Sequence, residues 1–452
     1  MHKMPHAKTI RPRMPRLLAG LLLTGLSLTP TIRAQQTTAL APLPPSQPSA
    51  KVLTWDDCVA LAAQKNPALV SSQYAAQASH AAYMGSFNGL LPTLNLSNGY
   101  SSSSGGNGGG GSGNGSPYYT AQADASIDLF NMGQIAGIRS AAANYSQAEA
   151  SLRQASASLR YSLRSAFAQA YIAEKNVEVA RMILEIQKRN AEEVALKYQS
   201  GKEYKGNMLS AQALYLQSQA SLAQTLRSVR TARRALDQQL GLDDFSEVTV
   251  SGTLVAQNPP DFPARMQDFL SARPDVAVQE AVVKNQRASV ASAQSTLWPT
   301  LSANYARSRN GSAEFPGSPY AWSAGAVLSY PIFGGGPTST YYAVKSAKNS
   351  LEKSLQDLRT VRDAAIVDLE NTWAAYANAI DGLRVAEANL GATRQRNAEA
   401  EIRYASGLIT YDSWEVIVAE WVSAEQQSKL AQLSAVTTQA AWEKSLGKAL
   451  GE

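Results

Sequence analysis

The stretch that decides the fold is residues 161–199, YSLRSAFAQAYIAEKNVEVARMILEIQKRNAEEVALKYQ, with a second copy at residues 367–405, VDLENTWAAYANAIDGLRVAEANLGATRQRNAEAEIRYA. A sustained seven-residue repeat of apolar residues is typical of a coiled coil and not of a short globular helix. No proline interrupts residues 134–199 or 338–405, so each predicts one helix of roughly 66 residues, about 100 Å long. The repeat is carried by Leu163, Ala170, Val177, Leu184, Ala191 and Tyr198 in the first copy, and by Leu369, Tyr376, Leu383 and Leu390 in the second.

The N-terminal segment has the pattern of a secretory signal. Residues 1–34 contain six Lys or Arg residues and no Asp or Glu, and an apolar run at residues 17–28 precedes Ala34. This pattern predicts a signal peptide at 1–34, with an uncleaved anchor as the alternative, and Arg33 leaves the cleavage position open. The Pro-, Ser- and Ala-rich residues that follow predict an extended linker at 35–52.

Composition excludes several classes of protein. The full chain has 41 Lys and Arg residues against 35 Asp and Glu residues, and the two signs balance once residues 1–34 are set aside, which removes the main argument for a nucleic-acid partner. The single cysteine, Cys58, rules out an internal disulfide framework and predicts a small buried residue on a helix. Three histidines and one cysteine do not make a credible metal site, and no catalytic constellation is found. We therefore predict a protein that is not an enzyme and has no cofactor.

The body of the chain is an internal duplication with an offset of about 206 residues. The offset predicts a first repeat at 53–241, an equatorial connection at 242–273, a second repeat at 274–447 and a C-terminal tail at 448–452. The matching positions are Pro67 and Pro274, Leu91-Pro92-Thr93-Leu94 and Trp298-Pro299-Thr300-Leu301, Phe130 and Phe333, Gly133 and Gly336, Arg189-Asn190-Ala191-Glu192 and Arg396-Asn397-Ala398-Glu399, Tyr198 and Tyr404, Gly201 and Gly407, and Leu240-Gly241 and Leu446-Gly447.

Each repeat contains two strands with one apolar face. The alternation predicts strands at about 93–103 and 117–130 in the first repeat and at about 300–309 and 319–332 in the second, with tyrosine and tryptophan near their ends. Strands of this kind are typical of an outer-membrane β-barrel, although a soluble pair of half-buried hairpins has the same alternation. The Gly-, Ser- and Asn-rich residues 101–116 predict a mobile loop and lack the features of a phosphate-binding loop.

Four strands cannot close a barrel by themselves. An open sheet edge in lipid leaves unpaired backbone groups that cost several kcal/mol each, so the chain is expected to assemble around an axis. Two copies would supply eight strands with a filled interior, and three copies would supply twelve with room for a channel. The small polar residues of the inner face favour the channel.

Taken together, these motifs resemble the outer-membrane efflux protein family, the TolC-like outer membrane factors. The resemblance covers about residues 53–447. It implies a mainly α fold in which a duplicated helix–hairpin–long helix–helix unit forms a trimeric, 12-stranded outer-membrane β-barrel, continued by a periplasmic α-helical coiled-coil barrel. It is carried by Leu53-Thr54-Trp55-Asp56-Asp57, the two Pro-Thr-Leu strand starts, Arg273-Pro274-Asp275-Val276, the Tyr-x-x-Gly turns at 198–201 and 404–407, and the two Leu-Gly ends.

The resemblance also implies a function and partners. It implies the exit duct of a tripartite efflux or type I secretion system in the outer membrane of a Gram-negative bacterium, spanning into the periplasm. The implied partners are two further copies of the chain, a periplasmic adaptor (membrane fusion) protein, an inner-membrane pump of RND, ABC or MFS type, and outer-membrane lipid. A structural or adhesive coiled-coil surface protein without channel activity is the alternative. Neither the substrate nor the type of pump is readable from the sequence.

Two groups of residues are candidate sites. The turns that contain Gly201, Gly206, Gly407 and Leu408 lie farthest from the predicted strands, so they are candidates for adaptor docking. The resemblance implies a periplasmic gate lined by acidic residues after the second turn, for which Asp412 and Glu415 are candidates together with Tyr404. The match is inexact, because the family's two acidic positions fall on Ser413 and Val416 and its arginine falls on Ile409. The alternative is that Asp412 caps the following helix and Glu415 completes a capping box.

Overall fold

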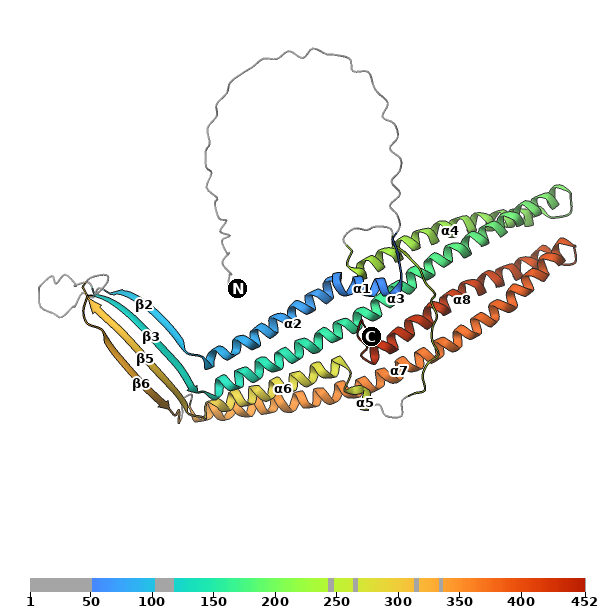
Figure 1. The fold of residues 1–452 in the computed structure, drawn as a ribbon. Coiled ribbons are helices and arrows are strands. Elements are labelled where there is room, and N and C mark those ends of the chain that lie inside the picture. Colours follow the sequence, from blue (N-terminus) through green and yellow to red (C-terminus); the bar gives the residue numbers. More distant parts are fainter. Residues whose placement is uncertain are drawn as a thin grey trace, which may run out of the picture. The chain divides into compact units, whose positions relative to one another are not determined.

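The computed structural model describes residues 51–101, 118–242, 248–262, 267–312, 317–332 and 336–451. The predicted signal peptide, most of the predicted linker and most of the Gly-, Ser- and Asn-rich loop lie outside the described residues. Within the described part, each repeat reads helix, hairpin, long helix and returning helix, as the duplication predicts (Figure 1).

Two long helices run through the described helical part of the chain. They are α3 (Met132–Gln199, 68 residues) and α7 (Pro337–Ala405, 69 residues), and they confirm the two uninterrupted helices predicted from the seven-residue repeat. Several residues of that repeat are buried, including Leu163 and Ala170 in α3 and Leu369 and Tyr376 in α7.

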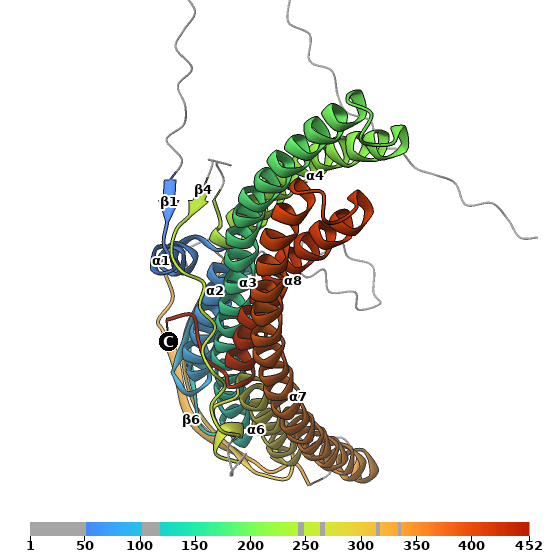
Figure 2. The same ribbon diagram turned by 90° about the vertical axis from the view of Figure 1, so that its right-hand side faces the viewer.

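Shorter helices cover each half of the two long ones. The returning helices α4 (Lys205–Leu240) and α8 (Tyr411–Ser445) pack along the halves of α3 and α7 that lie away from the strands. The strand-side halves pack against α2 (Pro67–Ser86), which η1 (Phe87–Leu90) extends, and α6 (Pro274–Ser295). Figure 2 shows the α3–α4 hairpin beside the α7–α8 hairpin, with α3 contacting α8.

A four-stranded antiparallel sheet occupies one end of the helices, in the order β2-β3-β5-β6. The two hairpins have equivalent registers, with Thr93 opposite Ser126 in the first and Thr300 opposite Ser329 in the second. Both outer strands have one edge that pairs with no described residue, so this sheet is open. The strands are β2 (Thr93–Ser101), β3 (Tyr118–Phe130), β5 (Thr300–Gly311) and β6 (Ala321–Ser329).

One face of this sheet carries large apolar side chains that remain exposed. Leu96 is 79% exposed, Trp322 is 71% exposed and Leu328 is 68% exposed. An exposed apolar face of this size on a soluble protein is unusual, and it marks a surface that contacts lipid or another protein. No described helix combines the length and hydropathy needed to cross a membrane.

The largest core lies where the first repeat meets the connection. The short helix α1 (Trp55–Lys65) begins with a capping box, because Thr54 Oγ1 accepts from the Asp57 N–H at 3.3 Å and the Asp57 carboxylate accepts from the Thr54 N–H at 3.0 Å. Cys58 is fully buried in α1, as predicted, and burial raises the pKa of its thiol to about 12. Gly241 ends α4 at φ 69°, and a Cβ there would lie 2.2 Å from the Lys65 carbonyl oxygen, so only glycine fits.

The connection between the repeats lies against helices of both. Its strand β4 (Val248–Val250) pairs in parallel with β1 (Lys51–Leu53), and a single helical turn, α5 (Gln267–Leu270), precedes α6. Between β4 and α5, the Trp373 indole N–H donates to the Pro260 carbonyl oxygen at 3.0 Å, and the Gln432 side chain donates to that of Leu254 at 3.0 Å. The connection therefore contacts both α7 and α8.

Candidate functional site

The two helical hairpins reverse in turns of the same kind. Gly201 has a φ of 70°, and the N–H of the next residue donates to the Lys197 carbonyl at 2.8 Å. Gly407 has a φ of 73°, and the Leu408 N–H donates to the Arg403 carbonyl at 2.8 Å. This is the Schellman arrangement, in which glycine adopts the left-handed conformation that ends a helix.

The other two candidate docking residues behave differently. Gly206 is the second residue of α4, its φ is not positive, and a Cβ there would meet open space, so it is a helical residue and not a turn glycine. Leu408 lies in the second turn and is 75% exposed, and Tyr204 in the first turn is 82% exposed. Each turn therefore presents one large exposed side chain.

An aromatic cluster fills the tip of the second hairpin. The Tyr404 ring of α7 stacks on the Trp414 ring of α8, with centroids 4.7 Å apart and planes 7° apart. Tyr411 packs at the edge of both rings, and all three side chains are less than 5% exposed. The same buried cluster includes Val194 of α3 and Ala211 of α4, so it joins the two hairpins.

A lysine from the first hairpin completes this cluster. Lys197 Nζ lies 3.6 Å from the centroid of the Tyr404 ring and also pairs with Glu193 at 2.9 Å. A cation over an aromatic face is attracted by the ring quadrupole, and the attraction is strongest where water is excluded. Burial, with smaller contributions from Glu203 and Glu193, raises the pKa of Tyr404, so its hydroxyl stays neutral.

The two acidic candidates lie on the first turns of α8, beside the cluster. Asp412 is exposed and Glu415 is half-buried. Burial and the neighbouring Asp412 charge raise the pKa of Glu415. Burial, followed by the Glu415 charge, raises the pKa of Tyr411 to about 12.

The predicted capping role of these acids is wrong. The N-cap of α8 is Thr410, whose Oγ1 accepts from the Ser413 N–H at 3.4 Å and lies 3.0 Å from the Ser413 hydroxyl. Asp412 lies inside the first turn, and Glu415 is not at the third helical position that a capping box requires. The two carboxylates are therefore not needed to start this helix.

Several buried polar atoms near this tip have no hydrogen-bond partner. They are the Tyr404 hydroxyl, the indole N–H groups of Trp414 and Trp421, and the Asn397 side-chain oxygen. Buried groups without partners are rare and costly, so a cluster of them calls for a physical explanation. All four lie on α7 and α8, and none lies on the matching part of α3 or α4 among the described residues.

Two ion pairs hold α7 and α8 together below the cluster. Arg394 contacts the buried Glu425 carboxylate, and Arg396 pairs with Glu420 at 2.6 Å. Lys197, Trp414 and these ion pairs were not predicted from the sequence, because the residues that contact one another lie on different helices. The run of aromatic residues on both sides of Gly407 was the one available signal.

The other end of the molecule offers a polar sheet face. Asn95, Asp124 and Ser323 occupy one row across the strands, opposite to the apolar face, and the Asn95 amide donates to the Asp124 carboxylate at 3.2 Å. Thr93 and Ser126 hydroxyls lie 2.8 Å apart in the next row. No group of His, Cys, Asp or Glu side chains in the described ranges is arranged to hold a metal ion.

Both repeats of the chain match a known protein family. The model of the outer membrane efflux protein family matches residues 58–242 and 266–448, which is more than half of the chain. Protein CyaE of Bordetella pertussis (strain Tohama I) is 26% identical over 268 residues, which is 58% of this chain and 55% of that protein. The match thus spans about half the length of that relative.

Solved outer-membrane channels have the same fold. The outer-membrane channel OprN has a TM-score of 0.76 at 22% identity, over 88% of this chain and 90% of that one. CusC has a TM-score of 0.78 at 18% identity over 87% and 92%, and the Campylobacter jejuni CmeC channel has 0.77 at 17% over 88% and 86%. These likenesses confirm the predicted fold class of a mainly helical chain with a sheet at one end.

Proposed function

Because this chain belongs to the outer membrane efflux protein family, we propose that three copies of it form the exit duct of an efflux or type I secretion system. The protein resides in the outer membrane and extends into the periplasm. In the proposed assembly the four strands of each copy form one third of a twelve-stranded barrel, and the helices of the two repeats, 53–241 and 274–447, line a periplasmic tunnel.

The observation that carries this proposal is the open sheet. Its two outer strands expose unpaired backbone groups, and its apolar face is uncovered by any described element. In a bilayer such edges cost several kcal/mol for each unpaired group, which strongly favours closure by further copies. Eight strands would leave an interior filled by side chains, whereas twelve leave a channel lined by the polar face.

The duplication supports one register for the seam between copies. Within the chain, β3 pairs with β5 so that Ser126 lies opposite Asn304. The equivalent residues are Ser329 on β6 and Ser97 on β2, as the matching hairpin registers indicate. A closed barrel would therefore place Ser329 of one copy opposite Ser97 of the next.

The hairpin tips are the proposed contact with the rest of the export system. In the assembly the turns at Gly201 and Gly407 lie at the far end of the tunnel, where a periplasmic adaptor and an inner-membrane pump can reach them. Tyr204 and Leu408 would supply apolar contacts there, because both are more than 70% exposed.

The aromatic cluster is the proposed resting lock of the gate. Lys197 contacts the buried Tyr404 ring across the two hairpins, so separating the hairpins breaks this contact. Separation would also admit water to the Tyr404 hydroxyl and the Trp414 indole, which lack partners in this state. Asp412 and Glu415 of the three copies would form two stacked acidic rings around the axis at the constriction, an arrangement that favours cations.

The seam register provides the test. Ser97→Cys with Ser329→Cys should form disulfides between copies and give a covalent trimer on denaturing gels, because directly opposite strand residues lie within disulfide range. Ser97→Cys with Leu328→Cys is the control, since neighbouring strand residues point to opposite faces. Purified wild type should conduct ions in planar bilayers. A monomeric, non-conducting protein would favour the structural or adhesive alternative.

A further inference from the structure

The strand-side ends of α3, α6 and α7 are cationic, and we call them the cationic collar. The segments 132–148, 281–295 and 337–351, from α3, α6 and α7, contain five Lys or Arg residues and no Asp or Glu. Neither α2 nor η1 contains any Asp, Glu, Lys or Arg residue. None of the five cations forms an ion pair with a described residue. The five residues are Arg139, Lys284, Arg287, Lys345 and Lys348.

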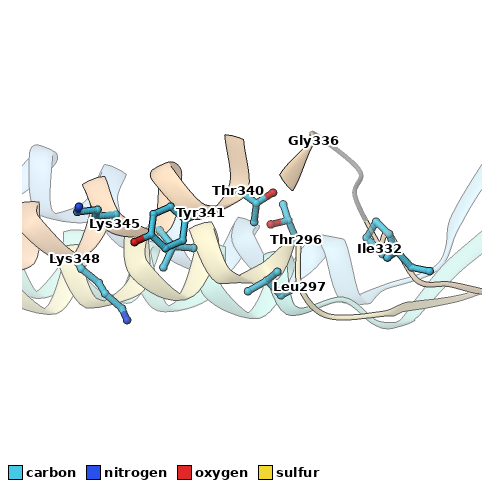
Figure 3. Close-up of a pocket in the computed structure, with 10 residues that line it drawn as sticks. Thr296, Leu297, Ile332, Gly336, Thr340, Tyr341, Lys345 and Lys348 are labelled. Atoms are coloured by element: carbon cyan, nitrogen blue, oxygen red, sulfur yellow. The ribbon is translucent and has the colours of Figure 1, made fainter. Parts of the chain in front are cut away.

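An apolar pocket lies within this collar, between the residues that directly follow α6 and the first turns of α7. It has a volume of about 490 Å³ and lies where β6 leads into α7. Figure 3 shows Ile332 at the end nearer the strands and Lys345 and Lys348 at the opposite end, with Leu297 and Tyr341 between them. The pocket therefore runs from an apolar end to a cationic end along the direction of the helices.

The apolar end continues the lipid-facing surface of the sheet. Leu328 belongs to the exposed apolar face of β6, and Ile332 follows four residues later with 72% of its surface exposed. At about 1.5 Å per helical residue, Lys345 and Lys348 lie roughly 12 and 16 Å beyond the start of α7. A phospholipid in the periplasm-facing leaflet is oriented in the same direction as the pocket. Its acyl chains lie at the level of the strands, and its phosphate faces the periplasm.

In the proposed assembly, a second copy would meet a side of α7 other than the one that lines this pocket. The side of α3 that faces α6 carries Ser140 and Asn144, since both side chains bond to Asn285. By the duplication, the corresponding side of α7 would face the α2 helix of a second copy, and its positions are Ala343 and Ala347. Neither of these residues lines the pocket. The adjoining α2 of a second copy would also bring no acid to the two lysines, because α2 has none.

We propose that this pocket binds a phospholipid with an anionic headgroup, one acyl chain lying against Leu297, Ile332 and Tyr341 and the phosphate contacting Lys345 and Lys348. This inference rests on the proposed placement of the sheet in the outer membrane. Lysines in such pockets are a known means of selecting anionic lipids, and each contributes about 1 kcal/mol near a charged surface. That corresponds to a factor of about five in affinity for each lysine.

Native mass spectrometry of the detergent-purified protein tests this inference. Bound palmitoyl-oleoyl phosphatidylglycerol is counted against phosphatidylethanolamine with the same chains. Wild type should retain phosphatidylglycerol about 25-fold more strongly, and Lys345→Gln with Lys348→Gln should remove that preference. The matched control is Lys353→Gln, which removes a lysine of the same helix that is already paired with Asp357 and should keep the preference.

Val344→Trp tests the apolar end separately. The larger side chain should fill the pocket and reduce retention of both lipids severalfold while the assembly stays intact. Equal retention of both lipids by wild type, or an unchanged preference in the double lysine variant, would overturn the inference. Loss of assembly in Val344→Trp would mean that a second copy fills the pocket. Conductance of the double lysine variant should equal that of wild type, which separates this test from that of the channel.

Discussion

The two helical hairpin tips have the same backbone conformation at the turn but differ in their side chains. Tyr198 and Tyr404 occupy the same position before the turn glycine, yet Tyr198 is 37% exposed and Tyr404 is 4% exposed. The partners of Tyr404 have no counterpart, because the positions of Tyr411 and Trp414 in the first repeat are Lys205 and Met208. The duplication has thus kept the turn geometry in both repeats, and a buried aromatic cluster is present in only one.

This difference predicts that the two helical hairpins have different roles in opening. The cluster of unpartnered buried groups lies on the second hairpin, whereas the first contributes Lys197 and a small apolar surface. A hairpin tip with costly unsatisfied groups is expected to rearrange more readily than a tip that has none among its described residues. Paired substitutions at equivalent positions of the two hairpins can test this asymmetry.

The largest expected effect is that of Trp414→Ala. Removing a buried tryptophan typically costs about 3–5 kcal/mol, and here the loss removes the surface on which Tyr404 stacks. We expect the closed tip to loosen and the resting conductance in planar bilayers to rise at least tenfold. Met208→Ala, at the equivalent position, should raise it less than twofold. Equal increases in the two variants would show that the hairpins contribute alike.

Substitution of the turn glycines gives the next largest effect. Gly201→Val and Gly407→Val both force a branched residue to a positive φ, at a cost of about 1–2 kcal/mol or more for each turn. We expect export to fall more than tenfold while trimers still assemble, with the larger effect for Gly407→Val because its turn adjoins the buried aromatic cluster. Gly206→Ala is the control, since it has a helical φ and open space, and should leave export unchanged. A loss of trimer yield as large as the loss of export would show that these glycines serve only to end the helices.

Substitution of the acids should change selectivity more than stability. Asp412→Asn with Glu415→Gln should lower the cation-to-anion permeability ratio severalfold and weaken blockade by multivalent cations. Reversal potentials across a salt gradient measure the ratio. Unchanged selectivity would place the gate elsewhere.

The pH dependence of stability tests whether the Glu415 charge stabilises or destabilises the fold. Burial raises its folded pKa above the unfolded value, so the folded state binds the proton more tightly and the charged form destabilises it. Glu415→Gln should therefore leave thermal stability unchanged or slightly higher near pH 7, with the difference vanishing below the usual glutamate pKa. A drop in stability at pH 7 would contradict this sign.

The smallest expected effect on gating is that of Lys197→Gln. A cation–π contact contributes about 0.5–2 kcal/mol, and here part of it is shared with the Glu193 ion pair. We expect a rise in open probability of about threefold, with no change in single-channel conductance. Arg403→Gln, at the equivalent position of the second repeat, should have no effect on gating. An effect of the same size from Arg403→Gln would remove the special role of Lys197.

The sequence predicted those features that depend on neighbouring residues. The long helices follow from the repeat and the absence of proline, the start of α1 follows from Thr54 and Asp57, and the turns follow from Gly201 and Gly407. The cap of α8 was misassigned because Thr410 and Asp412 both suit an N-cap and lie within the usual uncertainty of a helix start.

The aromatic cluster at the second tip could not be predicted from the sequence. Tyr404 is buried because Lys197 and Val194, more than 200 residues earlier, come to lie against it. Such a contact depends on how α3 packs beside α7 and α8, and no periodicity within one helix specifies that. The exposed apolar face of the sheet was predictable, because alternation along a strand fixes its faces without any distant partner.

The two unpaired edges of the sheet also have a genetic consequence. In the proposed trimer each chain would contribute one edge to each of two seams, so a chain that is defective at one edge spoils one of the three seams. In a cell that makes normal and defective copies in equal amounts, only about one assembly in eight would be built from normal chains alone if the three copies are drawn at random. Mutations at the β2 or β6 edge that still permit partial assembly should therefore be dominant, whereas those that prevent the chain from joining at all should be recessive.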